Sequence, residues 1–210
     1  MERMDACERR DRADAAYQDL ERTVRKGHRF VLLRGPVGSG KGSAARRLYG
    51  ELSADGTLKA IDPLSIAFLR QAVGWNSKRD RLPVPMFRAP HHTASTVALC
   101  GSDRLPGEVT LALHGVLLLD EISEFPSKVI HDLVHALSHG AVTVYRRGSF
   151  FWWPARPRVV VFTITDCPCG ASKHNFTRHH CTCTPAQIGR HQDRISVVLK
   201  HLKPAVIPFG

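Results

Sequence analysis

Short apolar runs alternate along the chain with stretches whose apolar residues recur every three or four positions. Uninterrupted apolar runs of four to eight residues are typical of parallel strands that are covered on both faces. Such runs predict strands at 30–33, 116–119 and 159–164, and a shorter strand at 206–207. The helical spacing, with capping residues at several ends, predicts helices at 12–26, 44–52, 64–73, 127–139 and 185–192. Buried strands that alternate with helices predict an α/β fold with a parallel sheet.

The region around residue 147 departs from this alternation. Two runs rich in β-branched and aromatic residues, 142–145 and 150–153, flank a four-residue turn sequence that contains Gly148. This pattern predicts a β-hairpin. Apolar and polar residues do not alternate along 150–153, so we expect one face of the hairpin to pack on the core and the other to expose an aromatic ring.

Composition limits the class of protein. A chain of 210 residues, 43% hydrophobic and 23% charged, is long enough for one core and is not a largely disordered chain. We expect a helical lead-in at 1–27 and a core domain at 28–210, which includes the hairpin region 141–157 and a cysteine-rich loop at 166–184. Because no apolar run approaches the roughly 20 residues of a membrane-spanning helix, and no signal peptide pattern opens the chain, we expect a cytoplasmic protein without a membrane partner.

The charge is positive and unevenly distributed. The net charge is +11, and residues 140–210 carry 10 basic and 2 acidic side chains. A field of this sign favours a polyanionic partner, although many basic proteins bind no nucleic acid.

A glycine-rich turn lies between the first predicted strand and the next helix. Backbone N–H groups of such a turn can surround a phosphate without interference from Cβ atoms, and the helix N-terminus adds positive potential. A lysine at the end of the turn reaches the terminal phosphates of a nucleotide. We therefore predict that ATP binds here, through Gly35, Pro36, Val37, Gly38, Ser39, Gly40, Lys41, Gly42 and Ser43.

Two acids follow the second predicted strand, and they complete a candidate hydrolytic site with Lys41. Asp120 would hold the shell of a Mg²⁺ ion, and Glu121 would orient the attacking water. The phosphate loop departs from the full pattern here, because the hydroxyl residue that follows the lysine and holds Mg²⁺ is replaced by Gly42. Ser43, one position later, is the remaining candidate ligand. The alternative is structural, since aspartate is also a common cap of a following helix.

Several segments resemble those of a known family, the magnesium-chelatase-like AAA+ ATPases of the ComM/YifB type. The resemblance extends over about residues 13–199 and is most specific at 85–95, 106–121, 124–126, 154–156 and 167–170. It implies a P-loop AAA+ core, with a parallel sheet flanked by helices and a β-hairpin insertion before the fourth strand. Members are hexameric. The competence-associated branch is an ATP-driven helicase that migrates DNA branches, whereas the chelatase subunit drives magnesium insertion into porphyrin.

The chain departs from that family in ways that bear on hydrolysis. The family has a Lon-like domain before the core and a helical lid after it, and we expect both to be absent here. An ungapped comparison places Thr165 at the sensor 1 asparagine and Leu202 at the arginine finger. A gapped alternative instead reads 193–195 as the finger motif. Together with Gly42, these two differences weaken three catalytic positions of the family. The sequence therefore supports impaired hydrolysis about as well as competent hydrolysis.

Four cysteines gather within 17 residues of a chain that has no secretion signal. Cys167 and Cys169 form one pair and Cys181 and Cys183 the other, with three histidines between them. Four thiolates on two turns can close a tetrahedral zinc site, and the imidazoles are possible substitutes. The alternative is a loop of reduced thiols, which a cytosolic protein tolerates.

The predicted hairpin is a candidate DNA interface. Arg146 and Arg147 lie beside several aromatic residues, and such a combination suits a nucleic-acid backbone and base stacking. In the resembled AAA+ branch this hairpin projects toward the substrate in the hexamer pore. A hairpin that merely packs is the alternative.

Three functions therefore remain open from the sequence. The first is an ATP-binding module of a DNA-processing ATPase that binds single-stranded or branched DNA. The second is a noncatalytic interaction module that depends on nucleotide and zinc, and the third is the motor subunit of a metal chelatase.

Overall fold

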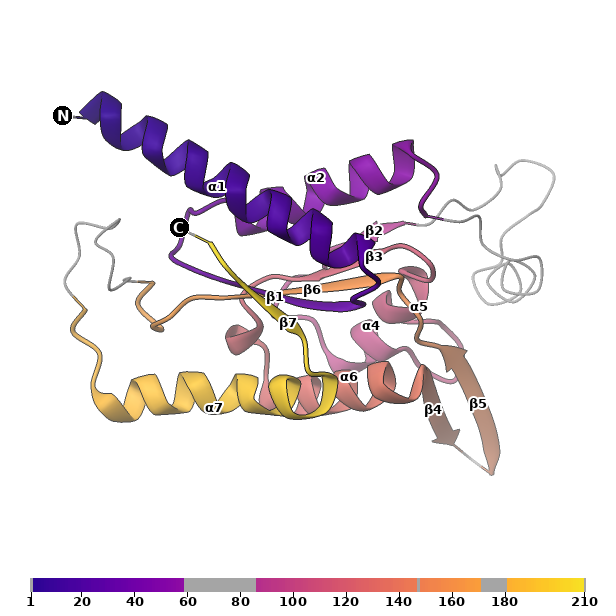
Figure 1. Cartoon of the computed structure of the whole chain (residues 1–210). Helices are drawn as coiled ribbons and strands as arrows, with labels where there is room; N and C mark the ends of the chain where they lie inside the picture. The colour runs from indigo at the N-terminus through magenta and orange to yellow at the C-terminus, as the bar shows by residue number, and fades with distance from the viewer. Residues whose placement is uncertain (1, 59–85, 147, 171–180, 210) are drawn as a thin grey trace.

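A central parallel sheet with helices on both faces forms the body of the protein (Figure 1). The computed structural model describes residues 2–58, 86–146, 148–170 and 181–209. The sheet has five strands in the order β2-β3-β6-β1-β7. Their bounds are β1 Phe30–Arg34, β2 Phe87–Arg88, β3 Val116–Leu119, β6 Val159–Ile164 and β7 Ala205–Pro208. All pairings are parallel, as the apolar runs predict, and the α/β fold class is confirmed.

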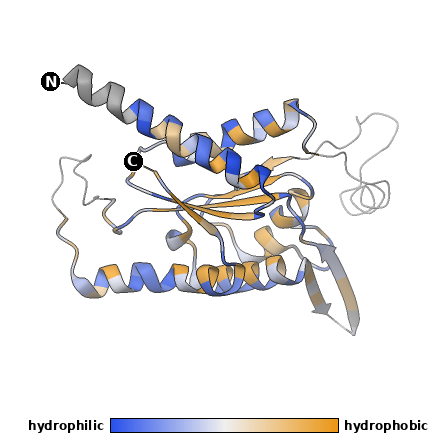
Figure 2. Ribbon diagram, viewed as in Figure 1, coloured by the Kyte–Doolittle hydropathy of each residue, from blue (hydrophilic) through white to orange (hydrophobic). Residues whose placement is uncertain are grey.

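Two hydrophobic clusters fill the spaces between the sheet and its helices. On one face, α1 (Glu2–Arg25) and α2 (Lys41–Ala54) cover the sheet, and the buried face of α1, including Tyr17 and Leu20, joins this cluster. On the other face lie α4 (Thr96–Cys100), α5 (Glu108–Leu111), α6 (Ser127–His139) and α7 (Pro185–Leu202). Hydrophobic residues concentrate accordingly on the strands and on the side of α6 that faces them (Figure 2).

The predicted strand bounds at 116–119 and 159–164 are confirmed, as is helix 127–139, which ends at Gly140 in the left-handed conformation (φ 69°). The hairpin is confirmed as β4 (Ala141–Arg146) paired with β5 (Ser149–Pro154). The helix predicted at 64–73 lies outside the described residues. None of the described helices is long and apolar enough to cross a bilayer.

Three predicted helices are wrong in length, and the smallest difference is at α2, which runs over 41–54 rather than 44–52. Helix α1 begins at Glu2 rather than at residue 12. Helix α7 continues to Leu202, ten residues beyond the predicted end, because His191, Ile195, Val198 and Leu202 extend one buried stripe at three- and four-residue spacing. Burial of this stripe against the sheet and α6 outweighs the weak helix propensity of the β-branched residues in the second half of α7.

Candidate functional site

The phosphate loop lies at the carboxyl end of β1, where the chain turns into α2. Gly38 and Gly40 have φ values of 78° and 88°, which side chains rarely adopt. Gly35 is required for a different reason, since a Cβ there would lie 1.8 Å from the carbonyl oxygen of Phe209, just after β7. The conformation of the loop therefore requires glycine at 35, 38 and 40, the three glycines that precede Lys41 in the predicted phosphate loop.

The loop leaves polar groups available for a ligand. Gly40 is the N-cap of α2 and, having no side chain, provides no capping hydrogen bond to the first N–H groups of the helix. Within the described part of the chain, the buried hydroxyl of Ser39 has no hydrogen-bond partner. Unpaired donors at a helix N-terminus fit the phosphates of a nucleotide.

Lys41 is the buried cation of the site, with 4% of its surface exposed. Its Nζ donates to the carbonyl oxygens of Gly35 and Pro36, at 2.9 and 2.8 Å, and lies 3.6 Å from Oε1 of Glu121. Burial lowers the pKa of Lys41, while the nearby Glu121 and Asp120 act in the opposite direction. The predicted lysine and both predicted acids therefore form one electrostatic unit.

Thr163 of β6 forms hydrogen bonds with both acidic residues, Asp120 and Glu121. The hydroxyl of Thr163 donates to Oδ1 of Asp120 at 2.6 Å and accepts the backbone N–H of Glu121 at 2.8 Å. Glu121 adopts the left-handed conformation (φ 50°) and provides no side-chain cap to the short 3₁₀ helix η1 (Ile122–Glu124) that follows it. The capping alternative is therefore not supported by the hydrogen bonds, which hold Asp120 toward β6 and leave its second oxygen for the loop.

Position 42 is the part of α2 that faces Asp120. A Cβ built on Gly42 would lie 3.6 Å from Oδ2 of Asp120, which is an ordinary contact distance. Ser43 is exposed and lies about 100° further round the helix. The side-chain position that approaches the acid is thus the one that lacks a side chain, and the magnesium role of Ser43 stays a prediction.

Thr165 is buried at the end of β6 and is bound on both sides. Its hydroxyl donates to the carbonyl oxygen of Cys167 at 3.0 Å, and its own carbonyl oxygen lies 2.8 Å from Nε2 of the buried His191 on α7. Since a carbonyl oxygen only accepts, Nε2 of His191 carries the proton. The candidate sensor residue is therefore held by the cysteine loop and by α7.

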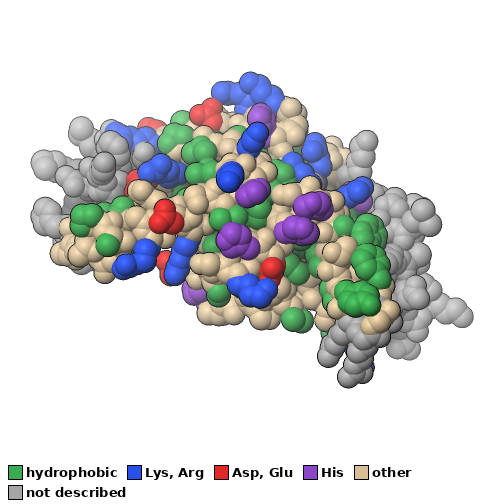
Figure 3. Space-filling view, turned by 90° about the horizontal axis from the view of Figure 1, so that it is seen from below, with side chains coloured by type: hydrophobic (Ala, Val, Ile, Leu, Met, Phe, Trp, Pro, Cys, Tyr) green, Lys and Arg blue, Asp and Glu red, His purple; other side chains and the backbone are tan. Residues whose placement is uncertain are grey.

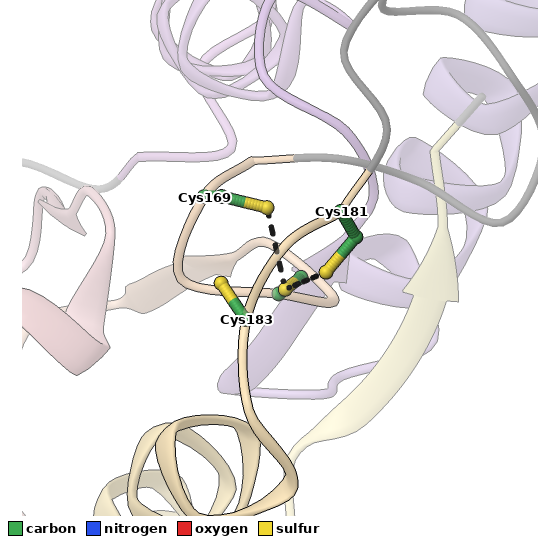
Figure 4. Close-up of side chains that lie close together, drawn as sticks. Cys169, Cys181 and Cys183 are labelled. Atoms are coloured by element: carbon green, nitrogen blue, oxygen red, sulfur yellow. Dashed lines mark hydrogen bonds between the residues drawn. The ribbon is translucent and has the colours of Figure 1, made fainter.

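The four cysteines converge on one point between β6 and α7 (Figure 4). All four sulfur atoms lie within 4.8 Å of one another, and Cys167 Sγ is 3.2 Å from Cys181 Sγ and 3.4 Å from Cys169 Sγ. Zn²⁺ bound by thiolates at about 2.3 Å in a tetrahedron requires sulfur atoms about 3.8 Å apart. Burial raises the pKa of the Cys167 thiol to about 12. The arrangement fits zinc, whereas the three histidines considered as substitutes lie outside the described residues.

The two alignments for the arginine finger place different residues in α7. Leu202, the ungapped match, is buried at the C-terminal end of α7 and packs in the larger hydrophobic cluster. Arg194, the gapped match, is exposed on α7, and its Nη1 donates to the carbonyl oxygen of Ser123 at 2.6 Å, within the same subunit. Leu202 is therefore not presented outward as a finger must be, whereas Arg194 is exposed and is held by the carbonyl oxygen of Ser123.

The hairpin has one packed face and one exposed face, as its sequence predicts. Trp153 is buried and donates from Nε1 to the carbonyl oxygen of Ser102 at 2.6 Å. On the opposite face, Tyr145 and Phe150 are cross-strand partners and are 76% and 66% exposed, with Trp152 beside them. Hydrophobic side chains gather on this hairpin, at the right of Figure 3. Arg147 and the side chain of Arg146 lie outside what the structure describes.

Sequence reasoning missed three residues of this site: Thr163, His191 and Gly170. The one signal for Thr163 is a hydroxyl in an otherwise apolar strand. His191 continues the buried stripe of α7, but its spacing does not reveal its partner. Gly170 ends the segment 167–170 that carries part of the family resemblance, but the sequence does not show that a Cβ there would lie 2.6 Å from Cγ2 of Val37 in the phosphate loop.

Comparison with known proteins identifies the family. The family model described as magnesium chelatase, subunit ChlI, matches residues 12–202. The chain is 36% identical over 173 residues to competence protein ComM of Haemophilus influenzae, covering 81% of this chain and 32% of that protein. It is 33% identical over 179 residues to YifB of Escherichia coli, covering 84% and 34% respectively. The chain thus spans about a third of the length of these curated relatives.

Solved structures agree on the fold. NtrX from Brucella abortus, crystallised in complex with ATP, has a TM-score of 0.55 at 16% identity and covers 94% of this chain and 36% of its own. A structure of the BchI and BchD subunits of magnesium chelatase also has a TM-score of 0.55 at 16% identity, covering 88% and 66%. The family model and the close sequence relatives go further than the fold: the chain belongs to the magnesium chelatase ChlI family and is an AAA+ protein of the ComM/YifB type.

Proposed function

We propose that this chain is the ATP-binding core of a DNA-processing AAA+ ATPase of the branch-migration helicase type, acting in the cytoplasm as a homo-oligomer, a hexamer in its complete form. The observation that carries the nucleotide part is the contact of buried Lys41 with the loop carbonyl oxygens and Glu121. This contact unites the loop after β1 with the acids after β3. The relatedness to competence protein ComM supports the DNA part.

ATP supplies a terminal phosphoryl group that is transferred to water. The N–H groups of the loop and Lys41 bind and orient the phosphates, because they provide a fixed positive end at α2. Asp120 would hold the shell of a bound Mg²⁺, and Glu121 would orient the attacking water. The hydroxyl of Thr163 fixes Asp120 and the backbone of Glu121 relative to each other.

The decisive test of the nucleotide site is the Lys41→Ala variant. Loss of a buried charged partner amounts to about 2 kcal/mol or more, so we expect nucleotide affinity to fall at least about 30-fold. Calorimetric titration with a nonhydrolysable ATP analogue measures the change. Lys128→Ala is the matched control, since Lys128 is an exposed lysine of α6. Equal affinity of Lys41→Ala and the parent protein would refute the site.

A second candidate function is a noncatalytic module that binds nucleotide without hydrolysing it. Three positions favour it: Gly42 lacks a metal-binding hydroxyl, Thr165 donates its hydroxyl to Cys167, and Leu202 is buried. Measuring ATP turnover beside ATP binding separates the two functions. The third candidate, the motor subunit of a metal chelatase, predicts stimulation of turnover by a porphyrin-binding partner and none by DNA.

The exposed face of the hairpin supports DNA as the partner. Tyr145 and Phe150 form an exposed aromatic pair, and Arg146 and Arg147 directly follow Tyr145 in the sequence. Stacking of one base on an aromatic ring contributes about 1–3 kcal/mol. Because binding to single strands releases counterions, log affinity falls with log salt by about 0.7 for each neutralised phosphate. Replacing both arginines by alanine should reduce this slope by about one to two units.

The aromatic pair provides a separate test of the DNA interface. The double variant Tyr145→Ala, Phe150→Ala should weaken binding to single-stranded DNA at every salt concentration and leave the slope nearly unchanged. Val97→Ala, which removes an exposed hydrophobic residue from α4, is the control. If both double variants, the aromatic and the basic, bind DNA as the parent does, the hairpin has only a structural role.

The cysteine cluster completes the proposal, as a site for one Zn²⁺ per chain. It is supported by four sulfur atoms that converge without any disulfide among the described cysteines. Elemental analysis of protein purified without chelator should find one zinc in the parent and in Cys100→Ala, a cysteine of α4 outside the cluster. Cys181→Ser should lose most of the metal. A zinc content near zero in the parent would refute the assignment.

A further inference from the structure

The cysteine cluster lies between the end of β6 and the start of α7. Cys167 and Cys169 follow β6 by three and five residues, and Cys183 immediately precedes Thr184, the N-cap of α7. Thr184 and Gln187 form a capping box with Pro185 in the first turn, so the start of α7 is well defined. A metal held by both cysteine pairs would therefore join the end of β6 to the start of α7.

One contact path leads from the cluster to the candidate sensor. The carbonyl oxygen of Cys167 accepts from the hydroxyl of Thr165 at 3.0 Å and from the N–H of Gly170 at 2.8 Å. The carbonyl oxygen of Thr165 in turn accepts from His191 of α7. The position of Cys167 thus fixes both the rotamer of Thr165 and the turn that ends at Gly170.

A second path leads from the same turn to the phosphate loop. Gly170 has a φ of 75° and approaches Val37 so closely that a Cβ would lie 2.6 Å from its Cγ2 and 3.5 Å from its Cβ. The loop is also anchored to β6, because the N–H of Gly35 donates to the carbonyl oxygen of Ile164 at 3.1 Å. The cysteine turn and the phosphate loop are therefore in direct contact.

We propose that the four-cysteine centre is a zinc site that is energetically coupled to the nucleotide site, through Gly170 against Val37 and through Thr165. This inference rests on the proposed nucleotide and zinc sites. Zinc fixes the turn from 167 to 170, and the turn limits the conformations of the phosphate loop. Coupling between two sites is reciprocal and typically amounts to about 5–150-fold, so nucleotide must raise zinc affinity by the same factor as zinc raises nucleotide affinity.

The first experiment measures both directions of the coupling in the full chain. Calorimetry with a nonhydrolysable ATP analogue compares zinc-loaded protein with protein depleted by a chelator and reloaded. We expect depletion to weaken nucleotide binding about fivefold or more, and reloading with zinc to restore it. Competition of the protein with a chromophoric zinc chelator should show the same factor when the analogue is added. Lys41→Ala should lose this effect of the analogue, which excludes direct chelation of zinc by the nucleotide.

The second experiment disrupts the contact between Gly170 and Val37 and leaves the four cysteines unchanged. Gly170→Ala should keep one zinc per chain but reduce both nucleotide affinity and coupling, because its Cβ displaces Val37. Adding Val37→Ala removes the methyl group 2.6 Å away and should restore part of the affinity. Gly56→Ala is the matched control, since Gly56 has a φ of 73° and a Cβ there would meet no atom within 4 Å.

The outcomes separate this inference from the proposals on which it rests. Absence of zinc in the parent would overturn the metal site and the coupling together. Zinc without any nucleotide binding would overturn the nucleotide site. If zinc and nucleotide both bind and neither affinity depends on the other ligand, only the coupling is wrong. Circular dichroism of the depleted protein and of each variant distinguishes a local effect from unfolding.

Discussion

A serine at position 42 is the sharpest test of how the nucleotide site would hold magnesium. In Gly42→Ser the new Cβ would lie 3.6 Å from Oδ2 of Asp120, so the residue fits without displacing the acid. Two neighbouring ligands of an octahedral Mg²⁺, each about 2.0–2.1 Å from the ion, are about 2.9 Å apart. The serine hydroxyl, one bond beyond the Cβ, can reach that separation from Oδ2.

The expected gain follows from the ligand that the hydroxyl replaces. An interaction with a charged group contributes about 1.5–3 kcal/mol, and we expect the lower end because a water ligand is displaced. This value corresponds to about tenfold tighter magnesium binding in the nucleotide complex. Oδ1 of Asp120 already accepts a hydrogen bond from Thr163, so Oδ2 is the oxygen that would be available to a metal ion.

The assay is a magnesium titration of ATP turnover, and of nucleotide affinity if turnover is absent. Gly42→Ala is the control, since it adds the same Cβ and a similar increase in helix propensity without the oxygen. We expect the apparent magnesium constant to fall about tenfold in the serine variant only. If serine and alanine give the same magnesium dependence, position 42 does not face the metal and the geometry of the site is wrong.

Three further predictions concern the buried groups around the site and the core. Thr163→Val should lower stability by about 1–3 kcal/mol in urea unfolding, because it leaves the N–H of Glu121 without its acceptor, and should also weaken the magnesium dependence of nucleotide binding. Phe162→Ala should destabilise by about 3–5 kcal/mol in the same assay, since Phe162 is fully buried in β6. Burial and the hydrogen bond to Glu51 raise the pKa of Tyr17 above its usual 10, so the tyrosine's contribution to stability is present below pH 10 and is lost as pH rises further. The free energy of unfolding should therefore fall less steeply as the pH rises in Tyr17→Phe than in the parent protein.

The sequence predicts the parts of the fold that local pattern determines. The runs at 116–119 and 159–164 are short, almost wholly apolar and sharply bounded, and both strands have the predicted bounds. The phosphate loop is equally visible, since its glycines and Lys41 lie within a few residues of one another. Helix α7 shows the limit, because burial against the sheet extends it past the point where local propensity weakens.

The missing parts of the site are contacts between distant segments. Thr163 is separated from Asp120 by 43 residues and Gly170 from Val37 by more than 130, and only the order of the strands brings them together. Position 42 is a further case. The sequence shows that a hydroxyl is missing there and offers Ser43 instead, but the rotation of α2 relative to Asp120 decides which position faces the acid.

The order of the strands also explains why coupling between the sites is physically reasonable. In a parallel sheet all carboxyl ends lie at one edge, so the loops after β1, β3 and β6 meet there. Strand β1 is paired on both sides, with β6 and β7, and Gly35 is closed in by Phe209. The base of the phosphate loop is therefore rigid, and its outer part, at Val37, remains 59% exposed. A metal-bound turn packed on that outer part would act where the loop has most freedom, so we expect its occupancy to change nucleotide affinity without altering the sheet.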